Sequence, residues 1–160
     1  MSEDDAPELR RLLVKDIMVK DPITVYSETT VREAALVMER SAVGCVLVTR
    51  DERERTVVGI VTERDLVRRV LTREGDLSGT NVQSIMSSPL IVIGSDATIE
   101  EAARIMERNN VRRLPVVDQA GSVGMLTVDD LAKALAKQLE YSDAVFNAMA
   151  RVTAPKGLYA

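Results

Sequence analysis

Two short stretches of the chain carry a threonine and an aspartate three residues apart. They are Gly59–Leu66 and Gly124–Leu131, and the second begins 65 residues after the first (124 − 59). In both, a glycine and two apolar residues form a short predicted strand, with the glycine allowing a tight turn into it. The threonine then ends the strand and caps a predicted helix, with the aspartate at the third helical position.

A hydroxyl and a carboxylate at the start of a helix have a chemical use. The free N–H groups and the dipole at a helix N-terminus favour a phosphate. An ionised carboxylate only accepts hydrogen bonds, which suits the paired hydroxyls of a ribose. Thr62 with Asp65 and Thr127 with Asp130 are therefore candidate nucleotide contacts. The alternative is that each pair only caps its helix, and capping and ligand binding can coexist.

The composition argues against catalysis and against a metal site. Histidine is absent from the 160 residues, so the usual general base at neutral pH and the commonest metal ligand are missing. Cys45 is the single cysteine and lies in the apolar run Val43–Val48, so we expect a buried thiol rather than a nucleophile. One cysteine also excludes an internal disulfide and a cysteine zinc site.

The charge balance argues against nucleic acid and membrane partners. The net charge is −4, with 21 Lys and Arg against 25 Asp and Glu, and aromatic residues make up only 2%. No apolar run approaches the length of a membrane span, and the stretch Met1–Pro7 is acidic and polar, so it is not a secretory signal. We therefore expect a cytoplasmic location.

The elements that must position the two stretches follow the order strand, helix, strand, strand, helix, twice. In the first half we predict strands at 23–26, 45–49 and 56–61, a helix from Thr30 to about Ser41, and a helix at 65–71. The box Thr30–Glu33 opens the longer helix, which is expected to bury Val31, Ala34, Ala35 and Met38. A short helix is predicted before this half, from Pro7 to Val14.

The second half repeats this order after a linker rich in glycine and charge. Strands are predicted at 89–93 and 114–117, with a tight turn at 118–121, and a helix from Thr98 is expected to bury Ile99, Ala102, Ala103 and Met106. Ile85–Met86 repeats Ile17–Met18 at an offset of 68 (85 − 17). Beyond Asp130 we predict a helix with Leu131, Leu135 and Leu139 on one face, and Ser142 is placed to cap a further helix.

The predicted organisation is thus an internal duplication. It comprises an N-terminal segment with a short helix at 1–13, a first repeat at 14–72, a linker at 73–80, a second repeat at 81–139 and a C-terminal helix and tail at 140–160. One repeat has too little apolar surface to be stable alone, so we expect the two to pack against each other.

This ordered set of motifs resembles the cystathionine-β-synthase-type domain, the CBS domain, present as a tandem pair over about Val14–Leu139. The resemblance rests on Ile17–Met18 with Pro22–Val25, on Ile85–Met86 with Val111–Asp118, and on the two glycine stretches. It implies an α+β fold in which two β-α-β-β-α repeats pack through their sheets with pseudo-twofold symmetry. It also implies a homodimer that binds AMP, ADP, ATP or S-adenosylmethionine and regulates another protein.

The resemblance assigns the residues of a first cleft between the repeats. Asp65 would take the ribose hydroxyls and Thr62 a phosphate, while Leu90 and Ile91 would enclose the adenine. Arg112 and Arg113 would hold phosphate, since a guanidinium suits bidentate contact; the alternative is that they form an exposed surface at the start of a strand. The full set is Ile60, Thr62, Asp65, Leu90, Ile91, Val111, Arg112 and Arg113.

The second cleft would lack an obvious anion anchor, unless Lys20 reaches it. Gly44–Cys45 stands where the other repeat has Arg112–Arg113, and Leu47 replaces Pro115. We therefore predict that the first cleft binds a phosphate-bearing ligand more tightly, and that the second is either empty or takes a less charged adenosine compound. The residues of the second cleft would be Ile23, Thr24, Val43, Gly44, Met125, Thr127 and Asp130.

The leading interpretation is a ligand-sensing module without catalysis and without a separate cofactor. The family also occurs inserted in dehydrogenases, but this chain retains no barrel and no histidine to support an enzyme. A purely structural dimerisation module and a nucleic-acid-associated regulator remain as alternatives.

Overall fold

The computed structural model describes residues 12–51, 53, 56–74, 76–88 and 90–138. Most of the helix predicted at Pro7–Val14, and the elements predicted beyond Leu139, lie outside these residues. Among the described helices, none combines the length and apolar character needed to cross a membrane.

The chain divides into two compact units that differ from the two sequence repeats. One unit combines residues 22–91 with 119–122, and the other combines residues 12–21 with 92–118 and 123–138. We call them the first-repeat unit and the second-repeat unit. The N-terminal residues therefore fold with the second repeat, and the residues that follow the first repeat fold with the first.

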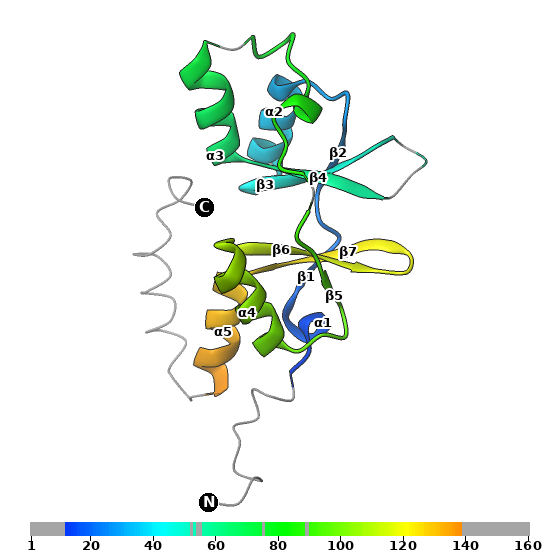
Figure 1. Ribbon diagram of the computed structural model, residues 1–160, viewed down its shortest axis with the longest axis vertical. Coiled ribbons are helices and arrows are strands. Elements are labelled where there is room, and N and C mark those ends of the chain that lie inside the picture. The colour runs from blue at the N-terminus through cyan, green and yellow to red at the C-terminus, as the bar shows by residue number, and fades with distance from the viewer. Residues whose placement is uncertain (1–11, 52, 54–55, 75, 89, 139–160) are drawn as a thin grey trace, which may run out of the picture. The chain divides into compact units, whose positions relative to one another are not determined.

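The first-repeat unit contains a three-stranded sheet in the order β2-β3-β4. Its strands are β2 (Thr24–Tyr26), β3 (Cys45–Thr49) and β4 (Val57–Thr62), with β2 parallel and β4 antiparallel to β3. The helices α2 (Val31–Ser41) and α3 (Glu63–Asp65) lie side by side against one face of this sheet (Figure 1). The aliphatic core between them includes Val46, Val48 and Val61.

The second-repeat unit contains a four-stranded sheet in the order β1-β7-β6-β5. The strands are β1 (Val19–Lys20), β5 (Ile93–Gly94), β6 (Arg113–Asp118) and β7 (Gly121–Thr127). As in the first unit, the outer strand β5 is parallel to its neighbour β6. The helices α4 (Ile99–Asn109) and α5 (Val128–Gln138) lie against one face of the sheet, and the short α1 (Val14–Ile17) precedes β1 (Figure 1).

Matching caps fix the long helix of each repeat. Thr30 accepts a hydrogen bond from the N–H of Glu33, and Thr98 does the same for Glu101, so both predicted capping boxes are confirmed. Each helix ends on a left-handed residue, Ala42 or Asn110. The predicted apolar faces are confirmed except at Ala35, which is half-buried, and at Ala103, which is exposed; the neighbouring Ala34 and Ala102 take the core-facing positions.

Two equivalent segments, which we call arms, explain why the units differ from the sequence repeats. The N-terminal arm, residues 13–20, pairs with β7 through Val19–Lys20, and the middle arm, residues 81–88, pairs with β4 through Ser87 and Ile60. The buried residues Val82 and Ile85 place the middle arm in the core of the first-repeat unit. The N-terminal arm thus adds to the sheet of the second repeat, and the middle arm adds to the sheet of the first repeat.

The glycines of the two motifs make this arm docking possible. Gly59 faces the side chain of Met86, and Gly124 faces Met18, so closely that a Cβ atom at either glycine would collide with the methionine. Neither glycine has the positive φ of a tight turn, since Gly121 is the one described glycine that does. The prediction that these glycines serve a turn is therefore wrong, and close packing explains them instead.

Four further predictions need correction. The strand predicted at 89–93 is reduced to Ile93–Gly94, because no described ladder partner pairs with residues 90–92. The helix predicted at 65–71 is a succession of α3, a π-helical segment at Leu66–Val70 and a 3-10 turn at Leu71–Arg73. Cys45 is half-buried rather than buried, because it is the first residue of β3. Leu13 bridges Thr98 as extended backbone, so helix begins only at Val14.

Candidate ligand-binding motifs

The first Thr–Asp motif is a complete capping box at the end of β4. Asp65 Oδ2 accepts from the N–H of Thr62 at 2.9 Å and from its hydroxyl at 3.0 Å, while the N–H of Asp65 donates to Thr62 Oγ1 at 3.2 Å. The side chain of Asp65 is only 13% exposed. The cap therefore fixes this carboxylate through one oxygen and does not use Oδ1.

The second motif repeats this geometry at the end of β7. Asp130 Oδ2 accepts from the N–H and the hydroxyl of Thr127, both at 2.8 Å, and the N–H of Asp130 donates to Thr127 Oγ1 at 3.2 Å. The capping interpretation is thus confirmed for both motifs. It leaves open the ligand interpretation, because the second carboxylate oxygen is not part of either cap.

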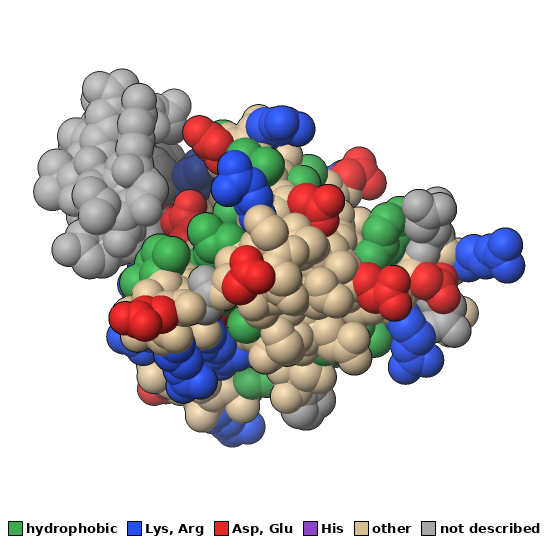
Figure 2. Space-filling model, turned by 90° about the horizontal axis from the view of Figure 1, so that it is seen from above, with side chains coloured by type: hydrophobic (Ala, Val, Ile, Leu, Met, Phe, Trp, Pro, Cys, Tyr) green, Lys and Arg blue, Asp and Glu red, His purple; other side chains and the backbone are tan. Residues whose placement is uncertain are grey.

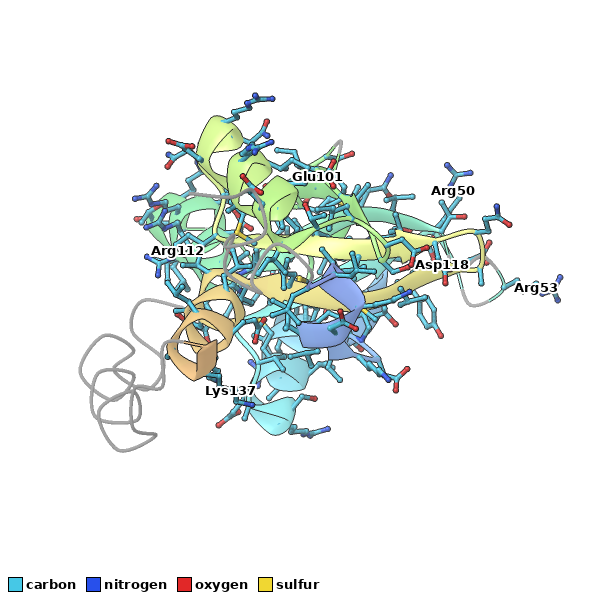
Figure 3. The ribbon with its side chains drawn as sticks, turned by 90° about the horizontal axis from the view of Figure 1, so that it is seen from below. Arg50, Arg53, Glu101, Arg112, Asp118 and Lys137 are labelled. Carbon is cyan, nitrogen blue, oxygen red and sulfur yellow. The ribbon has the colours of Figure 1, made fainter. Side chains whose placement is uncertain are left out.

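Each motif lies beside the start of the central strand of its own repeat. The N–H of Glu63 donates to the carbonyl of Gly44 at 3.1 Å, and the N–H of Val128 donates to the carbonyl of Arg112 at 2.9 Å. Arg112 is exposed, and Figure 3 shows it at the end of β6 where α5 begins, with Asp118 at the opposite end of that strand. Within the second-repeat unit, the arginine therefore neighbours the Thr127–Asp130 motif.

The other predicted contacts fall into the two units as follows. In the first-repeat unit, Thr24 is exposed at the start of β2, and the half-buried residues are Ile23, Val43, Gly44, Ile60, Leu90 and Ile91. In the second-repeat unit, Val111 and Arg113 are half-buried, whereas Met125 is buried within β7. Each predicted cleft draws residues from both units, so its assembly stays a prediction.

Sequence reasoning missed one charged neighbour of the first motif. Arg69 Nε lies 3.5 Å from Asp65 Oδ1, and Arg69 Nη1 donates to the carbonyl of Ile85 in the middle arm at 2.6 Å. The spacing of four residues between Asp65 and Arg69 on a predicted helix was the available signal. The equivalent position after Asp130 is Ala134, which is buried.

Neither motif is built as a metal site. Among the described residues, no three of the Asp, Glu and Cys side chains converge in a way that could hold a metal ion. On the face that Figure 2 shows, basic and acidic side chains are interspersed, with hydrophobic ones between them. That mixture accords with the small net charge of −4.

A family model settles what this duplicated architecture is. The model for the CBS domain matches the chain twice, at residues 14–72 and 82–137. The chain belongs to the CBS domain family. It is a tandem CBS pair with an α+β fold, as its resemblance predicted.

The chain is similar to proteins of comparable length and to longer ones. The CBS domain-containing protein YhcV of Bacillus subtilis is 34% identical over 119 residues, covering 74% of this chain and 82% of YhcV. The uncharacterized protein MK0525 of Methanopyrus kandleri is 32% identical over 124 residues, and the match covers 77% of this chain but only 62% of that longer protein.

A solved CBS pair extends the comparison to a bound ligand. The CBS pair of protein MJ0100, crystallised with 5′-methylthioadenosine and S-adenosyl-L-methionine, is 28% identical to this chain, with a TM-score of 0.70. The match covers 79% of this chain and 97% of that structure. Both of these ligands contain an adenosine group.

Proposed function

We propose that this CBS pair is a non-catalytic module that binds an adenosine-containing ligand and signals its presence to another protein. The Thr–Asp motifs carry this proposal, because both caps use Oδ2 and leave Oδ1 outside the cap. An ionised carboxylate held in this way accepts hydrogen bonds from sugar hydroxyls without having to reorganise. The adenosine compounds bound by the MJ0100 pair support the same ligand class.

The phosphate of the ligand would be held at the first cleft. There Thr62 and Asp65 are proposed to act with Leu90 and Ile91 and with the run Val111–Arg113. The exposed guanidinium of Arg112 is available for a phosphate, and Gly44 offers no side chain at the matching position of the other cleft. AMP, ADP and ATP are therefore expected to bind more tightly at the first cleft than at the second, where a less charged adenosine compound such as S-adenosylmethionine would fit better.

The module is further proposed to act as a homodimer. Ligand binding would shift the packing of repeats or subunits, and the regulated protein would recognise the favoured state. A ligand can shift such an equilibrium only by its difference in affinity for the two states. Light scattering with and without AMP tests whether the dimer forms and whether the ligand changes it.

Calorimetry with AMP, ADP, ATP, S-adenosylmethionine and NAD tests the ligand class. We expect binding by the wild-type protein and unequal losses of AMP affinity in Asp65→Ala and Asp130→Ala. Equal losses would contradict the predicted asymmetry of the two clefts. Failure of every adenosine compound to bind or to raise the melting temperature would leave a structural module.

A matched control separates ligand binding from helix capping. Glu33→Ala removes the carboxylate of the same kind of box at the start of α2, which contains no residue of either motif. We expect Glu33→Ala and Asp65→Ala to lower the melting temperature similarly, since both lose a capping box. Only Asp65→Ala should lose AMP affinity; an equal loss in Glu33→Ala would mean that stability alone sets binding.

A further inference from the structure

Arg69 distinguishes the carboxylate of the first motif from that of the second. Its guanidinium connects two groups of the first-repeat unit: Nε lies 3.5 Å from Asp65 Oδ1, and Nη1 donates to the carbonyl of Ile85 at 2.6 Å. The hydrogen bond to Ile85 anchors the guanidinium to the backbone of the middle arm. Arg69 is therefore held beside Asp65 and does not lie free in solvent, although its side chain is 42% exposed.

The second motif has no such neighbour. Ala134 occupies the position four residues after Asp130, and the described residues form no ion pair with Asp130. Asp65 and Asp130 have the same cap. Among the described residues Arg69 makes the difference in ion pairing, because Arg112, which lies beside the second motif, forms no described ion pair with Asp130.

This difference changes how many sugar hydroxyls each carboxylate can accept. A carboxylate has about four lone-pair positions, and the cap fills two of them on Oδ2 in both motifs. At Asp130 both positions of Oδ1 remain for a ligand, which matches the two hydroxyls of a ribose. At Asp65 the guanidinium of Arg69 lies against Oδ1, offsets its charge and obstructs one direction of approach.

We propose that Arg69 is a specificity-determining residue that weakens recognition of the ribose hydroxyls by the first motif. The inference depends on the proposed function, and it assigns the two motifs different ligand parts. The first motif would then select its ligand chiefly through phosphate and base, and the second through the cis-diol of the sugar. Arg69 acts through Asp65 and is not itself proposed to touch the ligand.

The test compares AMP with 2′-deoxy-AMP by calorimetry in variants that each leave one motif intact. Asp65→Asn and Asp130→Asn keep an amide oxygen for the cap but lose the carboxylate. In Asp65→Asn, where Asp130 remains, we expect loss of the 2′-hydroxyl to weaken binding by about tenfold or more. In Asp130→Asn, where Asp65 remains beside Arg69, we expect a change below about threefold.

Removing the guanidinium should convert the first motif to the behaviour of the second. In Asp130→Asn/Arg69→Met the ratio of the two affinities is expected to rise to about tenfold. Met matches Arg in helix propensity, and Asp130→Asn/Arg68→Met is the control, because Arg68 is an exposed neighbour without a described side-chain contact. The control should keep the ratio below about threefold.

The possible outcomes distinguish this inference from the proposed function. An unchanged ratio on loss of Arg69, or an equal ratio in Asp65→Asn and Asp130→Asn, overturns the inference while the proposed function stands. Absence of binding of either nucleotide by the wild-type protein overturns both. The comparison of the two Asn variants needs no change at Arg69, so it decides the question even if Arg69→Met fails to fold.

Discussion

The same Thr–Asp cap begins a helix in each repeat, but the two helices differ in length and regularity. After Asp130 the chain continues as the regular 11-residue helix α5. After Asp65 it forms only a short α-helical turn, which passes into the π-helical segment Leu66–Val70 and then a 3-10 turn. π-Helical turns are uncommon and often accompany functional sites. Here the π-helical segment carries Arg69, the residue that contacts both Asp65 and the middle arm.

The two arms also differ in how they pair with the sheets. The N-terminal arm forms a two-residue strand with β7, while the middle arm contributes a single bridge between Ser87 and Ile60. The arginine contact to Ile85 adds a side-chain hydrogen bond to the shorter pairing. The comparison indicates that duplicated units can reach one topology while dividing the stabilising contacts differently between backbone and side chains.

The largest effect is expected from substitutions in the two cores, which test whether the cores contribute equally to the free energy of unfolding. Leu126 in β7 and Val61 in β4 occupy equivalent, fully buried positions. Leu126→Ala should lower the free energy of unfolding by about 2–5 kcal/mol. Val61→Ala removes one fewer carbon and should cost about 0.8 kcal/mol less. Urea unfolding monitored by circular dichroism measures both values.

Leu71→Ala is the control for the core variants. Leu71 follows the π-helical segment and the residue is 59% exposed, so truncation should change stability by less than about 0.5 kcal/mol. A cost of Val61→Ala above that of Leu126→Ala would show that the first-repeat core collapses less well around a cavity than the second.

A smaller effect is expected where the arms dock on the two glycines. At Gly124 an added Cβ would meet Met18 and also the backbone oxygen of Val19 at 3.0 Å. At Gly59 the three atoms nearest to an added Cβ all belong to the side chain of Met86. Gly124→Ala should therefore cost about 1–3 kcal/mol, and Gly59→Ala less, because a methionine side chain can move aside.

Gly94→Ala provides the matched strand control for the glycine variants. A Cβ at Gly94 would have no neighbour within 4 Å, so this substitution should be neutral or slightly stabilising. Thermal unfolding of the three variants gives the order. A greater loss in Gly59→Ala than in Gly124→Ala would mean that Met86 is held more firmly than its side-chain contacts indicate.

Local signals in the sequence predicted the local structure well. The boxes Thr30–Glu33 and Thr98–Glu101 predicted the helix starts, and the apolar run from Cys45 predicted β3 with its bounds. The spacing of Thr62 and Asp65 predicted their cap. These features depend on residues at most a few positions apart, so a single sequence contains the information.

The features that the sequence did not predict involve contacts between residues distant in the sequence, or competition between neighbouring residues for one position in the core. The N-terminal arm pairs Val19 with Met125, and the middle arm pairs Ser87 with Ile60. The sequence around Val19 or Ser87 does not specify which strand it pairs with. Leu90–Val92 has the composition of a strand but lacks a ladder partner among the described residues. The contact of Arg69 with Asp65 was within reach of the spacing rule, whereas its contact with Ile85 required the fold.

The smallest expected effect compares the capping boxes of α2 and α4 as a function of pH. Hydrogen bonds from the N–H and hydroxyl of Thr30 lower the pKa of the Glu33 carboxyl in the folded protein. A lowered pKa contributes stability above the unfolded pKa of about 4.3, and this contribution is lost as the pH falls through the folded value. Glu33→Gln keeps a capping side chain but removes the charge.

We therefore expect Glu33→Gln to melt below the wild-type protein at pH 7, by less than about 2 °C. The difference should shrink as the pH falls below about 4.3 and vanish once the pH has passed the lowered pKa of Glu33 in the folded protein. Glu101→Gln is the matched variant of the second repeat. The carboxylate of Glu101 lies 3.4 Å from the hydroxyl of Thr98, against 3.0 Å for Glu33 and Thr30, so its effect should be smaller. A difference that grows in acid would contradict the pKa direction, because it would require the protonated carboxyl to be the better cap.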